Sequence, residues 1–306
     1  MINGISKKII HRLNQYGFLS FVSDESYLRW EYKNRTGLEL NLDNPLSFNE
    51  KMQYLKLHDR REIYHSLVDK YLVRKYIAEA IGEEYLIPLI GVYDSFDQID
   101  FGKLPNQFVI KCTHDSGGNV VCTDKTKLNI NKAKEKIRKS LRSNFYWSER
   151  EWPYKGLKPR IIIEEYLEDE QAVFYNRRGL TDYKFFCFDG TPQFLYVSQG
   201  LEDHKTASIS FFDFSGNKLP FHRADYKEFP GNRFELPGNF EHMLKIAEKL
   251  AKKVDNPFIR VDLYSVNGRI LFSELTFFPC SGMVPFEPKE YNDKLGSMIT
   301  FEKLKD

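Results

Sequence analysis

Two acidic residues in the C-terminal part of the sequence could together bind a metal ion. Asp262 lies in residues 258–264 and Glu274 in residues 270–276, and both runs are rich in β-branched and aromatic residues. Asn267-Gly268 separates the runs, a pattern typical of a β-hairpin. Carboxylates on neighbouring strands, with no His or Cys beside them, suit Mg²⁺ that is held jointly with substrate phosphates. A salt bridge on a solvated sheet face is the alternative interpretation of the same residues.

The length of the hairpin loop decides which side chains share a face. A two-residue turn would pair Val261 with Glu274 and put a carboxylate on the apolar face. We therefore expect a three-residue loop, residues 266–268, that pairs Leu263 with Leu271, because side chains alternate along each strand. In this register the apolar face carries Ile259, Val261, Leu263, Leu271 and Leu275, and the other face carries Arg260, Asp262, Phe272, Glu274 and Thr276.

Two lysines interrupt apolar strands, which is costly unless an anion lies nearby. Lys111 belongs to the predicted strand 107–112 and Lys184 to the predicted strand 183–188. No acid shares the strand of Lys111, so we expect phosphate as its counter-charge. The strand leads into residues 113–119, a small loop whose two glycines would let backbone N–H groups approach phosphates. A Gly-Gly pair alone more often marks a hairpin turn.

A further predicted strand, residues 160–167, ends in Glu164 and Glu165. A strand edge that exposes backbone N–H and C=O groups can bind the edge of an adenine ring. The preceding aromatic segment, residues 145–154, is interpreted as core, with stacking on a sugar ring as the alternative.

Helical patterns fill much of the remaining sequence. Residues 1 to about 65 are predicted to be mainly helical, and Ser47 with Glu50 forms a capping-box pattern. A single helix is predicted from Ile63 to about Gly82, and further helices over 131–144 and 240–254.

Composition limits the class of protein. A chain of 306 residues, 42% hydrophobic and 15% aromatic, can bury a large core and suggests about two domains. The net charge of +2 does not indicate a nucleic-acid partner. No apolar run approaches the roughly 18 residues of a membrane span, and the first residues lack the apolar centre of a signal peptide. Four cysteines without metal-site spacing are expected to be reduced, buried thiols of a cytoplasmic protein.

The order of these features resembles the ATP-grasp superfamily, which includes carboxylate-amine ligases such as D-alanine–D-alanine ligase. Within it, several motifs look like the TupA-like family of teichuronopeptide, capsular and O-antigen polysaccharide synthesis. The resemblance spans about residues 20–300. Its motifs are residues 44–51 (NPLSFNEK), 68–70 (VDK), 81–88 (IGEEYLIP), 111–117 (KCTHDSG) and 274–279 (ELTFFP).

This resemblance implies an α+β fold in which two lobes grip ATP between antiparallel sheets, with a helical N-terminal extension. The segments it implies are an N-terminal helical region (1–62), an N-terminal lobe (63–103), a lid subdomain (104–166) and a C-terminal subdomain with the Mg²⁺ site (167–306).

The resemblance also implies a role for individual residues. Lys70, Lys111 and Lys184 would contact ATP phosphates, with His114, Ser116, Gly117 and Gly118 in the loop that closes over them. Glu164, Glu165 and Leu167 would form the adenine hinge, and Glu168, Asp169 and Glu170 compete as the ribose-binding acid. Lys111 and Arg260 would be catalytic, with Arg260 on the transferred phosphate, and Asp262 and Glu274 would bind Mg²⁺. Thr276 stands where many ATP-grasp enzymes have Asn, which leaves the metal stoichiometry open.

The expected function is an ATP-dependent carboxylate-amine ligase. It would convert the carboxylate of a uronic acid in a surface polysaccharide, or in its precursor, to an acyl phosphate that an amine turns into an amide. Peripheral association with a polysaccharide assembly complex would fit this role. A sugar kinase and a non-catalytic nucleotide-binding subunit are the alternatives.

Overall fold

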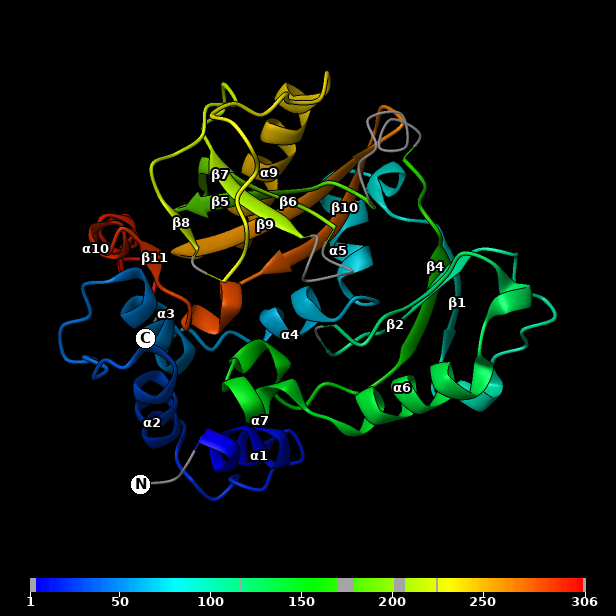
Figure 1. Ribbon diagram of the computed structural model, residues 1–306, viewed down its shortest axis with the longest axis horizontal. Helices are drawn as coiled ribbons and strands as arrows, with labels where there is room; N and C mark the ends of the chain where they lie inside the picture. Colours follow the sequence, from blue (N-terminus) through cyan, green and yellow to red (C-terminus); the bar gives the residue numbers. More distant parts are fainter. Residues whose placement is uncertain (1–3, 116, 170–178, 201–206, 224, 305–306) are drawn as a thin grey trace. The chain divides into compact units, whose positions relative to one another are not determined.

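The computed structural model describes residues 4–115, 117–169, 179–200, 207–223 and 225–304 (Figure 1). Ser116 and Glu170 therefore lie outside the described residues. The chain forms two compact units. The first unit comprises Met1–Glu31, Arg60–Lys75 and Ile87–Tyr166, and the second comprises Tyr32–Asp59, Tyr76–Leu86 and Leu167–Asp306. Each unit is thus assembled from three separate stretches of sequence.

The N-terminal part of the chain is helical, as predicted. Its helices are α1 (Gly4–Asn14), α2 (Asp24–Thr36), α3 (Phe48–His58), α4 (Ile63–Val68) and α5 (Val73–Ala80). The capping box at the start of α3 is confirmed: Glu50 N–H donates to Ser47 Oγ at 3.2 Å, and Ser47 N–H donates to the Glu50 carboxylate at 3.0 Å. These two bonds fix where α3 begins.

The single helix predicted from Ile63 to Gly82 is wrong, because the chain breaks between α4 and α5. Buried Asp69 causes the break. Its Oδ1 accepts hydrogen bonds from the N–H groups of Tyr71 and Leu72, both at 2.9 Å. An Asp that binds N–H groups two and three residues ahead caps a new helix start. Lys70 consequently lies in a turn rather than on a helix.

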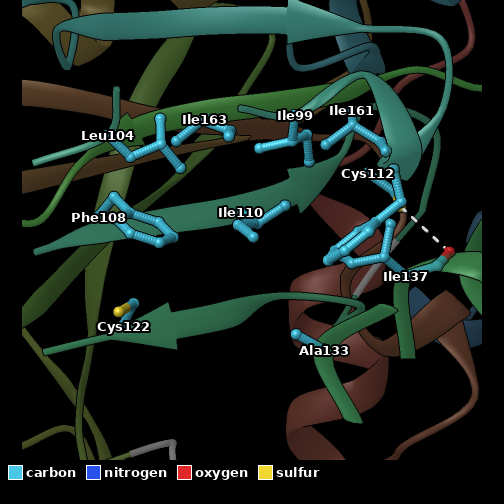
Figure 2. Close-up of a cluster of buried hydrophobic side chains, with 11 residues drawn as sticks. Ile99, Leu104, Phe108, Ile110, Cys112, Cys122, Ala133, Ile137, Ile161 and Ile163 are labelled. Carbon is cyan, nitrogen blue, oxygen red and sulfur yellow. Dashed lines mark hydrogen bonds between the residues drawn. The ribbon is translucent and has the colours of Figure 1, made fainter. Parts of the chain in front are cut away.

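The first unit is built on an antiparallel four-stranded sheet in the order β1-β4-β2-β3. Its strands are β1 (Leu89–Tyr93), β2 (Phe108–Cys112), β3 (Val120–Cys122) and β4 (Ile161–Glu165). One face packs on α6 (Ile130–Arg142), where Phe108, Ile110 and Ile163 join Ala133 and Ile137 in a buried cluster (Figure 2). Because side chains alternate, Lys111 and Glu164 project from the other face. β4 lies between β1 and β2 in this sheet, so both of its edges are paired along the strand.

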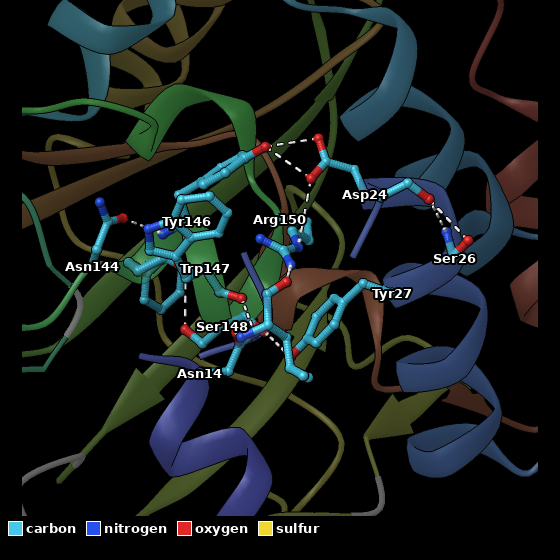
Figure 3. Close-up of polar contacts among 12 residues, drawn as sticks. Asn14, Asp24, Ser26, Tyr27, Asn144, Tyr146, Trp147, Ser148 and Arg150 are labelled. Carbon is cyan, nitrogen blue, oxygen red and sulfur yellow. Dashed lines mark hydrogen bonds and ion pairs between the residues drawn. The ribbon is translucent and has the colours of Figure 1, made fainter. Parts of the chain in front are cut away.

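A buried arginine organises the helical part of the first unit (Figure 3). Arg150 follows α7 (Phe145–Glu149), is fully buried, and places its guanidinium 4.6 Å from the ring of Tyr27 and 4.8 Å from that of Trp147. Asp24 accepts hydrogen bonds from Tyr146 Oη at 2.7 and 2.8 Å and lies 3.5 Å from Arg150. These contacts support the core interpretation of the aromatic segment over a sugar-stacking role.

The second unit contains an antiparallel five-stranded sheet in the order β10-β9-β5-β6-β7. On one face lies α9 (Phe240–Val254), where Phe240 stacks on Phe185. On the other face Phe48, from α3, contacts Phe186 and Phe258. The strands are β5 (Asp182–Phe188), β6 (Thr191–Gln199), β7 (Ser208–Phe212), β9 (Phe258–Val266) and β10 (Arg269–Thr276); β8 (His222–Arg223) pairs with β11 (Phe286–Glu287), and α10 (Glu290–Ser297) follows.

The hairpin of β9 and β10 differs from the predicted register. Arg269 pairs with Val266 across a two-residue turn in which Asn267 and Gly268 both have positive φ. A bulge then shifts the register between Phe272 and Glu274, so that Glu274 pairs with Asp262. The three-residue loop is wrong, yet the two carboxylates do share a face, because the bulge reverses the alternation of β10. Leu271 and Phe272 consequently lie on the faces opposite to those predicted.

The cysteines meet the expectation of buried, free thiols in part. Cys112, Cys122 and Cys187 are free, buried thiols, whereas Cys280 is free but only half-buried. Among the helices of the described chain, none combines the length and the apolar character needed to cross a membrane.

Candidate active site

In the first unit, Lys111 has an acidic partner on the neighbouring strand. Its Nζ donates to Glu164 Oε2 at 2.7 Å, and Arg74 Nη1 donates to Glu164 Oε1 at 3.1 Å. We call Arg74, Lys111 and Glu164 the lysine cluster. β2 and β4 pair with Lys111 opposite Ile162, which places Glu164 two residues along on the same face. Because this partner lies on a different strand, the residues within the strand of Lys111 do not indicate it.

The lysine cluster has one more cation than it has carboxylates. The Glu164 side chain is 7% exposed, against 16% for Arg74 and 21% for Lys111, so the carboxylate lies deepest. Arg74 also donates from Nη2 to Ile87 O at 2.8 Å, which fixes its guanidinium independently of Lys111. The excess positive charge therefore lies at the more accessible Lys111 ammonium, an arrangement that suits an incoming anion.

Lys70 lies beside the predicted phosphate loop. Its backbone N–H donates to Thr113 O at 3.0 Å. Its Nζ donates to Asp115 O and lies 3.9 Å from Asp115 Oδ1. The structure therefore brings Lys70 to the start of the 113–119 loop.

His114 is buried, and its Nε2 lies 3.2 Å from Ser143 O. Burial is the main cause that lowers the pKa of His114, which keeps its imidazole neutral near pH 7. His114 thus anchors the loop to the segment after α6 and adds no charge to it.

The glycine pair of this loop is required by its backbone and packing. Gly117 has φ +94°, a left-handed conformation that other residues rarely adopt. A Cβ atom on Gly118 would lie 2.6 Å from Ser140 Oγ and closer still to the Asp115 carboxylate. Larger residues at these two positions would distort the loop.

The residues assigned to the adenine hinge differ in exposure and in backbone hydrogen bonding. Glu165 is exposed, but its backbone N–H already donates to Pro88 O at 3.0 Å. Leu167 follows the end of β4 and is half-buried. Among the acids considered for ribose, Glu168 has an exposed side chain, and its carbonyl accepts a hydrogen bond from Asn267 at 3.0 Å.

In the second unit, four polar residues form a row across neighbouring strands of the five-stranded sheet. The register pairs Tyr196 with Lys184, Lys184 with Asp262, and Asp262 with Glu274. Directly paired residues lie on the same face of a sheet. We call these four residues, together with Arg260 on the same face of β9, the polar row.

Hydrogen bonds connect the members of the polar row. Lys184 Nζ donates to Asp262 Oδ2 at 2.7 Å and lies 3.2 Å from Asp182 Oδ1. Arg260 donates from Nε to Asp262 Oδ1 at 2.7 Å and from Nη2 to Asp262 Oδ2 at 2.6 Å. The same Nη2 donates to Glu274 Oε1 at 3.0 Å. Arg260 therefore bridges the two carboxylates that were predicted to hold Mg²⁺.

Asp262, Lys184 and Arg260 keep their charges around neutral pH. Burial alone would raise the pKa of Asp262, but Arg260 and Lys184 outweigh it and hold that pKa below its usual range. Burial opposes the charged forms of Lys184 and Arg260, yet the neighbouring carboxylates raise the pKa of both. With Asp182 included, this region has one more carboxylate than it has cations.

The donor atoms of the polar row fit a hard cation such as Mg²⁺. Asp262 and Glu274 supply carboxylate oxygens, and the Thr276 hydroxyl lies 3.0 Å from Glu274 Oε1. The Asp262 side chain is fully buried and already accepts bonds from two cations, whereas that of Glu274 is 46% exposed. Glu274 is thus the more accessible of the two carboxylates. The described residues include no group of three or more His, Cys, Asp or Glu residues suited to a metal, so phosphate oxygens would complete the coordination.

The motifs and the α+β architecture define an ATP-grasp protein. More narrowly, the chain belongs to the TupA-like ATP-grasp family, because the model of that family matches residues 50–300. A search of curated protein sequences finds no match.

Solved structures with similarity to the chain include several ligases, one of them described as an ATP-grasp ligase. D-alanine–D-alanine ligase from Bacillus anthracis, complexed with ATP, is 15% identical with a TM-score of 0.42, over 78% of this chain and 65% of that chain. The Helicobacter pylori enzyme is 15% identical with a TM-score of 0.41, over 82% and 69%. The ligase PsnB, complexed with a phosphomimetic precursor variant, Mg and ADP, is 10% identical with a TM-score of 0.44, over 80% and 61%. The chain thus spans about two thirds of the length of these proteins.

Proposed function

We propose that this protein is an ATP-dependent ligase that joins a carboxylate to an amine. The observation that carries the proposal is the polar row, where a buried Arg260 bridges Asp262 and Glu274 while Lys184 binds Asp262 from the other side. Such a set of fixed charges is suited to positioning and neutralising a phosphoryl group during its transfer. Membership of the ATP-grasp superfamily supports ATP as the phosphoryl donor.

Lys111 can move from Glu164 to a phosphate of ATP without leaving a buried carboxylate unpaired. Arg74 would continue to bind Glu164 through its separate hydrogen bond, and its contact with Ile87 O holds it in place. Breaking a buried ion pair is costly chiefly when one charge is left without a partner. The lysine cluster is therefore built so that Lys111 can exchange partners. Lys70 and residues 113–119 would add further phosphate contacts, and Glu164, Glu165 and Leu167 remain the candidates for adenine.

Asp262 and Glu274 would hold Mg²⁺, with Glu274 as the accessible ligand. When bound, the ion neutralises negative charge on the phosphates. Lys184 and Arg260 keep their positive charges throughout the neutral range, since their pKa values are raised, and they can bind the transferred phosphoryl group.

The reaction would proceed in two steps. A carboxylate oxygen of the acceptor attacks the γ-phosphorus, the bond to the bridging oxygen breaks, and ADP leaves. The amine nitrogen then attacks the acyl carbon of the acyl phosphate, inorganic phosphate leaves with the electron pair of the C–O bond, and the nitrogen loses a proton to give the amide. Arg260 would stabilise the charge that develops on the oxygens in both steps.

A uronic acid of a surface polysaccharide is the proposed acceptor. Support comes from the match to the TupA-like ATP-grasp family, together with the resemblance of the sequence motifs to proteins of teichuronopeptide and capsular polysaccharide synthesis. We place the reaction in the cytoplasm, where ATP is available and free thiols such as Cys112 stay reduced.

Replacing the amine with hydroxylamine tests this chemistry. With glucuronate as acceptor we expect a hydroxamate, ADP and phosphate, and a heavy-oxygen label in the carboxylate should pass to the phosphate. Glu274→Gln should suppress all three products. A stable phosphate ester on the sugar, without hydroxamate or label transfer, would indicate a kinase instead. No turnover of ATP with any acceptor would indicate a nucleotide-binding subunit.

A further inference from the structure

A small pocket in the second unit continues from the polar row. Arg260 and Arg223 both line it, together with Tyr196 and Cys280, and aromatic side chains that include Phe48 form the rest of its wall. Tyr196 is the end of the polar row on β6, so the pocket extends that row beyond the residues expected to serve ATP and Mg²⁺. Neither Arg223 nor Tyr196 stands out in the sequence by its spacing or its neighbours.

Both arginines retain the capacity to bind an anion in this pocket. Arg223 donates from Nε to Asp225 Oδ1 at 3.0 Å and also from Nη2 to Asp225, which leaves Nη1 only a long contact of 3.3 Å with Tyr196 Oη. Arg260 uses Nε and Nη2 for the polar row, and its Nη1 has no hydrogen-bond partner among the residues that the structure describes. Two guanidinium groups therefore face one small space with donors to spare.

The charge and shape of the lining favour a carboxylate. No acidic side chain in the described part of the chain lines the pocket, although Asp225 offsets part of the charge of Arg223 from outside it. Each guanidinium is paired with a carboxylate that lies outside the pocket, but within the pocket both present spare donors to a space lined otherwise by aromatic and other uncharged groups. The planar fork of a guanidinium matches the planar oxygens of a carboxylate. The limited space suits the acid group of a substrate rather than a whole sugar ring.

A strained turn holds one wall of the pocket in place. Cys280, Ser281 and Gly282 have successive φ values of 50°, 58° and 61°. Lys56, which is fully buried on α3, donates from Nζ to Ser281 O at 2.8 Å, and Gln53 donates to the same carbonyl at 3.0 Å. Left-handed non-glycine residues persist only where surrounding contacts enforce them, and such strain often marks a binding site. Here the strained turn brings Cys280 to the pocket.

We propose that this pocket binds a substrate carboxylate through Arg223, Tyr196 and the free edge of Arg260. Because Arg260 belongs to both the pocket and the polar row, the bound group would lie one guanidinium away from the phosphoryl site. The carboxylate belongs either to a uronate acceptor or to an amino acid that supplies the amine. Only this link to the ligase reaction rests on the proposed function; the anion pocket itself does not.

Cys280 provides a direct assay that needs neither ATP nor turnover. Iodoacetate and iodoacetamide both alkylate a thiolate, with an S–C bond formed as iodide leaves, but only iodoacetate carries a carboxylate. The other three cysteines are at most 2% exposed, so peptide mapping of the folded, full-length protein should find modification at Cys280. Mildly alkaline buffer is needed because burial raises the pKa of the Cys280 thiol.

The measured quantity is the ratio of the iodoacetate rate to the iodoacetamide rate at Cys280, relative to the same ratio for a free thiol. In Arg223→Gln we expect this ratio to fall about tenfold, the scale of one charge-assisted hydrogen bond. Arg269→Gln removes an exposed guanidinium of β10 outside the pocket and should leave the ratio unchanged. An equal ratio in Arg223→Gln and the unaltered protein would refute the proposal. So would a Cys280 that neither reagent modifies in the folded protein.

A second measurement uses the unaltered protein and asks which added acids slow the alkylation of Cys280. It identifies the source of the carboxylate and remains informative even if Arg223→Gln fails to fold. Glucuronate that slows alkylation, where neutral galactose does not, supports the uronate source; protection by glutamate alone supports the amino acid. Inorganic phosphate that protects as well as either acid would refute selectivity for a carboxylate, and no protection by any of them would refute the site. If no hydroxamate forms but an acid protects Cys280 from alkylation, the ligase chemistry is refuted and the carboxylate pocket is not.

Discussion

The lysine cluster of the first unit and the polar row of the second unit have opposite charge imbalances. In the lysine cluster one carboxylate, Glu164, is shared by two cations, and Lys111 is the more accessible of them. In the polar row, with Asp182, three carboxylates surround Lys184 and Arg260. The first arrangement favours an added anion and the second an added cation.

Burial also differs between the two regions. Asp262 is fully buried at the centre of its row, whereas the first unit keeps only the carboxylate of its cluster buried and leaves Lys111 partly exposed. A side chain that must exchange partners needs access to solvent, while one that fixes two cations is best held in the interior. The lysine cluster therefore resembles a movable contact and the polar row a fixed frame.

The largest effect is expected for Asp262→Asn. The sequence alone predicts that this change keeps the fold and removes only Mg²⁺-dependent binding of ATP. The structure changes that expectation, because Lys184 and Arg260 would be left buried without their main counter-charge. We expect a loss of about 3–5 kcal/mol in the free energy of unfolding, measured by hydrogen exchange of the β5 and β9 amides in urea.

Glu274→Gln is the matched control for Asp262→Asn. Its side chain is 46% exposed, so we expect a cost of only about 0–1 kcal/mol in stability. Both variants should lose Mg²⁺-dependent ATP affinity in calorimetry. Equal stability of the two variants would show that burial does not distinguish the two carboxylates, and unchanged affinity in both would overturn the metal site.

Lys111→Met, in contrast to Asp262→Asn, should lower activity strongly and change stability little. Arg74 remains bound to Glu164, so the fold should persist with a stability change of about 1 kcal/mol or less. Turnover of ATP should fall by about 10²–10³, the scale for losing one positioned charge donor. Lys132→Met, an exposed lysine of α6, is the control. If Lys111→Met unfolds the protein while each folded molecule stays active, Lys111 is structural.

The sequence predicted much of this fold because its local signals are strong. The capping box at Ser47, the amphipathic pattern of α9 and the alternation of β2 are all local features. What it could not provide were contacts between strands. Nothing local distinguishes the bulge beside Ser273, although this bulge decides that Asp262 and Glu274 face each other.

The same limit applies to the site. Lys184 was found because it interrupts an apolar strand, and Asp182, two residues earlier on the same face, offered a local signal that was missed. The roles of Arg74 and Arg223 depend on tertiary pairing with Glu164 and Tyr196, which no spacing in the sequence indicates. Charged residues on helices and short strands are ordinarily solvated, so only the structure separates these two from the rest.

Lys56→Met tests how the two units hold backbone with positive φ in place. The second unit fixes its left-handed turn with buried side chains, whereas the first unit relies on Gly117 and Gly118 for its loop. Without Lys56, Ser281 O loses a charged donor, and we expect a loss of about 1–3 kcal/mol in unfolding free energy. Alkylation of Cys280 should also become faster as the turn loosens. A stable variant with an unchanged alkylation rate would show that Gln53 suffices.

The smallest expected effect is a pH dependence that belongs to the first unit alone. In the polar row, Asp262 has a lowered pKa, and those of Lys184 and Arg260 are raised, so none of the three changes charge near neutrality. His114 differs, because burial lowers its pKa below the value of about 6.5 expected in the unfolded chain.

The sign of this dependence follows from proton binding. As the pH is lowered through about 6.5, the unfolded chain protonates His114 before the folded protein does. Stability decreases with falling pH wherever the unfolded state binds more protons than the folded state. The contribution is therefore complete above that pH and is lost as the pH falls toward the lower pKa of the folded state, by at most about 1.4 kcal/mol per pH unit. All three tryptophans, Trp30, Trp147 and Trp152, lie in the first unit, so tryptophan fluorescence in urea reports on it directly. His114→Gln should flatten the slope, while His222→Gln in the second unit should not; an unchanged slope in His114→Gln would assign the dependence to another group.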